Sequence, residues 1–160
     1  MQQPLQLFDP LRFLIIEIQK QLRLVQQYIA SADGNDAEKS LNRVDYIDNQ
    51  HLNLLRRISE QARQNDAHLD PITLQSFDHF NHSLKTLSRQ LQEVIFQARQ
   101  APKTTFYLLR KKRVNQTFDL LNDGLELIEP AMACEDSTLA IDLCRLDVRI
   151  DQLCQKQLEK

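Results

Sequence analysis

Glycine and proline, the residues that most often end helices and strands, are scarce in this chain. Its 160 residues include two glycines and five prolines. Because turns depend heavily on these two residues, such a chain has few turns and long elements. Leu, Gln, Arg and Ala favour helices and are abundant, whereas the residues that favour strands are sparse. The sequence therefore predicts an all-α fold.

Apolar residues recur every three or four positions, the period of an amphipathic helix. Asp9-Pro10 and Asp70-Pro71 each combine a capping residue with proline at the first helical position, so they predict helix starts. The pattern predicts helices over about 10–32, 36–62, 71–101, 104–128 and 137–158. Long helices joined by short loops are antiparallel neighbours. We expect a single domain over 1–160, an antiparallel up-and-down helical bundle of about five long helices.

Three local features refine these boundaries. Asn35 or Asp36 is the expected cap of the second helix, after the turn at Asp33-Gly34. The fourth helix is expected to open at Thr104 or Thr105. Gly124 and Pro130 predict a kink or a break near the end of that helix.

Charge and cysteine content limit the classes of function. A net charge of −2 gives no general attraction to nucleic acid, so no nucleic-acid partner is expected. Cys134, Cys144 and Cys154 show no C-x-x-C spacing, which favours a reducing compartment over a disulfide framework. The apolar run 14–16 is too short to cross a bilayer. We expect a cytoplasmic protein, either free or at the inner face of the cell membrane.

A weak internal repeat relates residues 13–58 to residues 116–160. In this alignment Asp33 meets Asp136 and Asp48 meets Asp151, and several apolar positions also coincide. The expectation is that two helical hairpins derive from one duplicated unit.

The second copy resembles the PhoU family of phosphate-uptake regulators. Its residues Asp136, Ala140, Asp147, Ile150 and Asp151 match the spacing typical of that family's second helix. The resemblance implies tandem three-helix bundles and a non-enzymatic module that regulates phosphate transport or phosphate signalling. The implied partner is a membrane transporter or its cytoplasmic face, since PhoU-like domains also form the cytoplasmic tails of bacterial sodium–phosphate cotransporters. The sequence leaves open whether the chain forms a homo-oligomer.

The chain departs from the family pattern in three places. Val44 stands where the first copy should carry an acidic residue, and 91–95 lacks the acidic run of the family's third helix. The chain also ends at Lys160, where a sixth helix would begin. These departures put the family's metal chemistry in doubt.

Asp147 and Asp151 lie one helical turn apart, so both carboxylates project from one face as half of a divalent-metal site. In the resembled family such pairs bind metal clusters, and here a third ligand is expected from the second helix, through Asp48 or Asp45. Because the third-helix acidic residue is missing, we expect no cofactor and no tight metal binding by the chain alone. Basic neighbours, Arg145, Arg149 or Lys156, are then expected to pair with the two carboxylates.

Two histidines are also candidates. His51 lies three residues after Asp48 within the apolar stripe, and we interpret the two as a buried hydrogen-bonded pair that fixes helix register. His82 lies opposite the stripe of the third helix, with Lys85 one turn beyond. That segment resembles the phospho-accepting helix of histidine-phosphotransfer domains, which gives an alternative function with His82 as phospho-acceptor. Thr86 stands where those domains carry a small residue.

The densest basic run is Arg110, Lys111, Lys112 and Arg113. It is a candidate contact for an anion or a partner, although four consecutive charges spread around most of a helix. No nucleophile with its base, Gly-rich phosphate loop or zinc-spaced Cys/His set appears. We therefore expect a non-enzymatic adaptor, and a generic helical interaction module is the remaining alternative.

Overall fold

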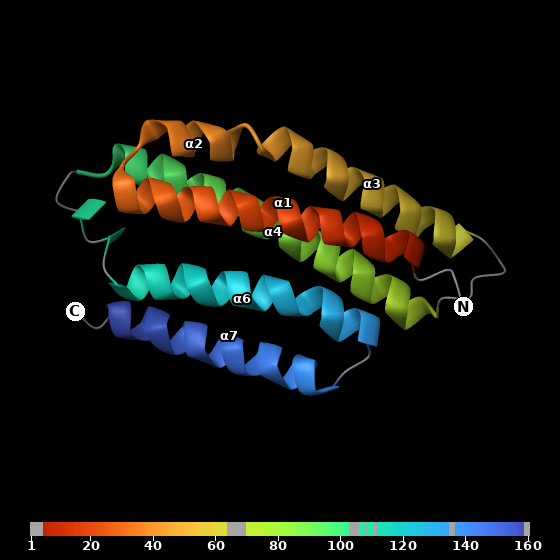
Figure 1. Cartoon of the computed structure of the whole chain (residues 1–160). Helices are drawn as coiled ribbons and strands as arrows, with labels where there is room; N and C mark the ends of the chain where they lie inside the picture. The colour runs from red at the N-terminus through yellow and green to blue at the C-terminus, as the bar shows by residue number, and fades with distance from the viewer. Residues whose placement is uncertain are drawn as a thin grey trace.

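The computed structural model describes residues 5–63, 70–102, 106–107, 109–110, 112–134 and 137–158. Their regular elements are all helices, which confirms the predicted all-α class. The helices, shown in Figure 1, are α1 Leu5–Ser31, α2 Gly34–Leu41, α3 Val44–Arg63, α4 Pro71–Gln100, α6 Lys112–Cys134 and α7 Ser137–Leu158.

The helices form an elongated bundle (Figure 1), in which α2 and α3 run in the same direction and the other successive helices run antiparallel. Helix α1 packs against α2, α3, α4 and α6, while α7 packs mainly against α6. Helices α1 to α4 thus form a three-helix bundle, in which α2 and α3 follow each other end to end and take the place of one helix. The α6–α7 hairpin joins it through α6, so α7 lies at the outer side of the molecule.

Helix α1 begins earlier than the capping signal at Asp9-Pro10 predicts. The structure places Pro10 inside a helix that starts at Leu5, and Leu7 and Leu11 are fully or almost fully buried. Pro10 is the sixth residue of the helix, so it removes one helical hydrogen bond, the one to the carbonyl four residues back. Burial of leucines on both sides of Pro10 outweighs the local signal.

The connection from α1 to α2 is a tight turn with an unusual backbone. Ala32 has φ 62°, in the left-handed region that favours glycine, and its N–H donates to the Tyr28 carbonyl at 2.8 Å. Asp33 then caps α2 by accepting a hydrogen bond from the Asn35 N–H at 2.9 Å. The predicted caps, Asn35 and Asp36, are wrong because both already belong to the first turn of the helix.

The second expected helix is interrupted at Asn42–Arg43, which separates α2 from α3. The Arg43 N–H donates to the Ser40 carbonyl three residues back, at 3.2 Å, so the chain tightens locally. The Arg43 side chain reaches α1 and donates to the Glu17 carboxylate at 2.5 Å, and Lys20 donates to the same buried carboxylate. Sequence periodicity gave no sign of this interruption.

Helix α4 begins and ends where the sequence predicts. Asp70 accepts from the N–H groups of Ile72 and Thr73 at 2.9 and 3.0 Å, and Pro71 occupies the first helical position. Its core stripe repeats at intervals of four and three residues: Phe77, Asn81, Leu84, Ser88, Leu91, Ile95 and Ala98. Phe80 and Leu87 lie half-buried beside that stripe.

Helix α6 runs through Gly124 and Pro130 without interruption, so the predicted break is wrong. Pro130 lies in the last two turns and deletes a single helical hydrogen-bond donor. A side chain at Gly124 would meet Leu146 of α7 only at ordinary contact distance. The predicted start at Thr104 or Thr105 lies outside the described residues.

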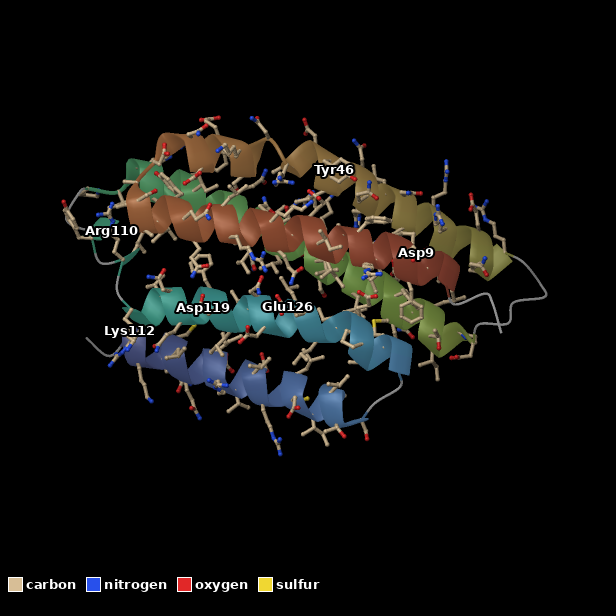
Figure 2. All side chains as sticks on the ribbon, in the orientation of Figure 1. Asp9, Tyr46, Arg110, Lys112, Asp119 and Glu126 are labelled. Atoms are coloured by element: carbon tan, nitrogen blue, oxygen red, sulfur yellow. The ribbon has the colours of Figure 1, made fainter. Side chains whose placement is uncertain are left out.

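A polar seam joins α6 to α1. Asp119 accepts a hydrogen bond from Gln26 at 2.9 Å, and Arg23 and Arg12 pair with Glu126 and Glu129 at 3.5 and 3.3 Å. Figure 2 shows Asp119 and Glu126 on α6, on its side toward α1. These pairs are largely exposed, so they contribute orientation more than stability.

The proposed repeat is compatible with two antiparallel hairpins, α1 with α2–α3 and α6 with α7. The first hairpin is interrupted at Asn42–Arg43, whereas α7 is continuous at the corresponding position. Asp136, the expected counterpart of the cap at Asp33, lies outside the described residues. The duplication therefore stays a prediction.

None of the helices that the structure describes combines the length and the apolar character needed to cross a membrane.

Replacing Ala32 with glycine is expected to stabilise the fold by about 0.5–1 kcal/mol, because the left-handed backbone strains any residue with a Cβ. Chemical denaturation measures this change. Ala30→Gly is the matched control, since Ala30 is exposed within α1, where glycine is expected to destabilise by a similar amount. A loss of stability in Ala32→Gly would contradict the left-handed assignment.

Candidate functional site

The three carboxylates proposed as metal ligands do not meet. Asp147 and Asp151 are exposed on α7, which packs mainly against α6. Asp48 lies on α3, where its Oδ1 is 3.1 Å from the Lys85 Nζ of α4. Within the described residues, no group of three or more His, Cys, Asp or Glu side chains is placed to hold a metal ion.

The expected basic neighbours do not form ion pairs with Asp147 or Asp151 in the described part of the chain. Arg145 donates to Asp142 at 3.0 Å. No ion pair joins Asp147 or Asp151 to a described residue, because no Lys or Arg lies three or four positions away from either of them along the helix. The prediction of pairing with Arg145, Arg149 or Lys156 is therefore wrong for the described part of the chain.

Two of the four residues in the basic run cap helix ends. The Arg110 Nε donates to the Ile29 carbonyl in the last turn of α1 at 3.2 Å, and its guanidinium lies 5.4 Å from the ring centres of both Phe106 and Tyr107. Arg113 donates to the Lys156 carbonyl near the end of α7 at 2.8 Å. Helix C-termini carry partial negative charge, so the positive charge of each arginine already interacts with a helix end.

The run therefore presents no continuous basic patch within the described residues. Figure 2 shows Arg110 in the connection from α4 to α6 and Lys112 at the start of α6. Lys112 is exposed, and Lys111 lies outside the described residues.

His51 is buried at the interface of α3 and α4, but its partner is Asn81 instead of Asp48. The Asn81 amide donates to the His51 carbonyl at 3.2 Å, which leaves the amide oxygen to accept from His51 Nδ1 at 3.0 Å. Burial is the largest cause that lowers the pKa of His51, and the charge of Lys85 also lowers it. His51 is therefore neutral at neutral pH.

Asn81 is not among the residues that the sequence pattern singled out. It lies in the buried stripe of α4, four residues after Phe77 and three before Leu84. A polar residue at such a position needs a buried partner. The regular spacing of Phe77, Asn81 and Leu84 was the signal that could have identified it.

His82 lies on the exposed side of the same interface, as its position opposite the stripe predicts. Its side chain is 58% exposed, and Nδ1 lies 2.9 Å from the Asp78 carbonyl and 3.2 Å from the Asp78 carboxylate. Its ring stands edge-on to the ring of His51, with 5.3 Å between centres. Lys85 is mostly buried, with its ammonium held by Asp48.

Helix α7 has a second apolar face, directed away from α6. We define this outer face by Ala140, Ile141, Cys144 and Val148, of which Ile141 and Val148 are 52% and 55% exposed. The inner face, Leu139, Leu143, Leu146, Ile150 and Leu153, is only half-buried. A shallow apolar hollow of about 760 Å³ follows the outer face, with Arg145 and Arg149 along one side.

Cys144 and Cys154 are both exposed free thiols. Cys134 belongs to the last turn of α6, and its side chain lies outside the described residues. The expectation of no disulfide framework stays a prediction for the whole chain.

Comparisons with protein-family models, with curated proteins and with solved structures find no match.

Stability should fall as the pH drops below about 6.5, because burial lowers the pKa of His51 from its ordinary 6.5. Between the lowered value and 6.5 the unfolded chain binds more protons than the folded chain, so acid favours unfolding. A single group contributes at most about 1.4 kcal/mol per pH unit. Denaturation at several pH values between 7 and 5 measures the slope.

His51→Gln should flatten this pH dependence. His79→Gln is the matched control, since His79 is exposed on α4 and its loss should leave the slope unchanged. An unchanged slope in His51→Gln would show that another group causes the acid sensitivity.

Proposed function

We propose that this chain is a non-catalytic, PhoU-like adaptor domain that acts by binding an amphipathic helix of a partner protein. The observation that carries the proposal is the outer face of α7, which has no covering element among the described residues. Apolar side chains in water cost free energy in proportion to their area, and an exposed apolar patch commonly marks a binding surface.

The spacing of the outer face fits a helical occupant. Ile141, Cys144 and Val148 follow one another at three and four residues, the repeat by which one helix packs against another. This is the same repeat by which the opposite face of α7 packs on α6. A partner helix would extend the layer order α1, α6, α7 by one more helix.

Opposite charges flank the outer face, and this pattern specifies the partner's chemistry. Arg145 and Arg149 lie on one side, and Asp147 and Asp151 lie on the other, all four exposed. A partner helix with acidic residues along one flank and basic residues along the other complements both sides. Such flanking charges set orientation and partner choice in paired helices.

A second copy of α7 fits this face poorly. Antiparallel self-pairing would place the arginine flank of one copy against the arginine flank of the other. Asp151 lies two turns after Cys144 on the same side of α7. Parallel self-pairing in register would therefore bring Asp151 of one copy against Asp151 of the other. Like charges oppose both arrangements, so a partner of different sequence is favoured.

The PhoU resemblance makes the proposal more specific. Asp147, Ile150 and Asp151 carry that resemblance, and the two aspartates also form the acidic flank of the outer face. By the resemblance, the partner is a membrane transporter or a protein of phosphate signalling, and the domain acts at the cytoplasmic side of the membrane. Regulation then follows from docking, without a catalytic step.

A photo-reactive amino acid at position 148 tests the proposal in the cells that make this protein. The expected product is a cross-link to one segment of another protein, with an amphipathic pattern and acidic and basic flanks, identified by mass spectrometry of the joined peptides. Ile141→Glu should abolish the cross-link, because it places a charge in the centre of the contact. The same probe at position 89, exposed on α4, is the matched control.

A synthetic peptide of the captured segment then measures affinity by fluorescence anisotropy. Arg145→Glu with Arg149→Glu should weaken binding by about tenfold, and exchanging the peptide's acidic flank for lysines should restore it. Cross-links only to a second copy of this chain, or equal capture at positions 89 and 148, would overturn the proposal.

A further inference from the structure

Helices α4 and α6 both pack on α1, but a groove separates them from each other (Figure 1). An apolar hollow of about 220 Å³ in this groove is lined by residues of α4 and α6 alone. Half-buried apolar side chains recur every seven residues along both helices: Phe80, Leu87 and Val94 on α4, and Val114, Leu121 and Ile128 on α6. Covering these side chains would release free energy in proportion to the apolar area removed from water.

A second line of residues on α4 runs beside its apolar line and is polar but uncharged. Its members also recur every seven residues: Ser76, Ser83, Gln90 and Gln97. Taken together, the two lines alternate at intervals of four and three residues, the repeat by which paired helices interlock. Because no residue of either line is charged, like charges do not oppose pairing of this face with its own copy, in contrast to the outer face of α7.

The two lines on α4 are almost symmetric about Leu87. Phe80 and Val94 lie seven residues before and after it, and Ser83 and Gln90 lie four before and three after. A two-fold axis across the helix at this point runs two copies antiparallel, with apolar line on apolar line and polar line on polar line. Leu87 then meets its own copy, Phe80 meets Val94, and the short Ser83 meets the longer Gln90, whose amide oxygen accepts from the hydroxyl.

The size of this face fits a dimer of modest affinity. The line from Ser76 to Gln97 is about 32 Å long, and two adjacent helices are about 20 Å wide. Pairing of the α4–α6 face therefore buries roughly 600 Å² on each copy, or roughly 1,200 Å² in total, which is at the lower end of the range for stable interfaces.

We propose that the α4–α6 face is a homodimer interface, with a two-fold axis that crosses α4 near Leu87. Helix α4 lies antiparallel on α4 of the second copy. The same axis lays α6 on α6, because α6 lies beside α4 in each copy. The centre of the interface consists of three apolar side chains from each of these four helices.

This interface is separate from the outer face of α7, because the two faces share no residue. The dimer therefore presents two outer faces, and a partner with two target segments binds both more tightly than one. The proposal goes beyond the adaptor function and can fail without affecting it, since one rests on α4 and α6 and the other on α7.

Sedimentation equilibrium of the full chain between about 1 and 100 μM tests the proposal, and a dimer with a dissociation constant in the micromolar range is expected. Ser83→Glu with Gln90→Glu places like charges opposite each other at two exposed positions, so it should weaken the dimer by about tenfold or more. Ser83→Lys with Gln90→Lys should do the same. An equal mixture of the two variants should restore a dimer with one copy of each, because Glu then meets Lys.

Arg89→Glu with Phe96→Glu is the matched control, since both residues are exposed on another side of α4 and are also seven residues apart. It should leave the dimer unchanged. Circular dichroism checks that each variant is folded, which is expected because the substituted residues are exposed.

Three results would overturn the proposal. A monomer at about 100 μM would leave the groove to a protein of different sequence. A dimer that persists in Ser83→Glu with Gln90→Glu, or that weakens equally in the control, would place the contact elsewhere. A mixture of the acidic and basic variants that stays monomeric would exclude the antiparallel pairing of α4.

Discussion

Burial of α1 is the constraint on which the rest of the fold depends. Its residues Leu7, Leu11, Leu14, Ile18, Leu22 and Val25 are fully or almost fully buried. A helix that is apolar on more than one side must be covered on more than one side. In this chain α2, α3, α4 and α6 provide that cover. The same burial draws Pro10 into the helix and brings the carboxylate of Glu17 inside, where Arg43 and Lys20 neutralise it.

The position of α7 follows from that arrangement. Because α6 occupies the remaining side of α1, it separates α7 from the central helix, and α7 packs mainly on α6. Its inner face is half-buried while Ile141 and Val148 stay more than half exposed. The exposure of the second apolar face of α7 is therefore a consequence of the helix order. In the proposed function, the charges that flank this second face select the partner, because complementary flanks favour one orientation and like charges oppose self-pairing.

His51 and His82 both lie at the α3–α4 interface, but His51 faces the core and His82 faces the solvent. His51 points inward, where Asn81 satisfies its Nδ1 and burial keeps it neutral. His82 projects outward, where its Nδ1 lies within hydrogen-bond distance of the Asp78 carbonyl and carboxylate. Both histidines therefore place Nδ1 beside an acceptor oxygen, yet only His51 is shielded from water.

The sequence by itself determined the fold class, the approximate extent of the long helices and the cap at Asp70, since all three depend on local propensity and periodicity. It also placed His82 on an exposed face, because a helical stripe defines its own opposite side. Only the tertiary structure decided the partners: Asn81 for His51, Lys85 for Asp48, and the carbonyls at the ends of α1 and α7 for Arg110 and Arg113. The interruption at Asn42–Arg43 and the helical Pro10 also arise from packing. Periodicity shows which face of a helix is apolar, but it holds no information on which helix will cover that face or at what position along the helix axis.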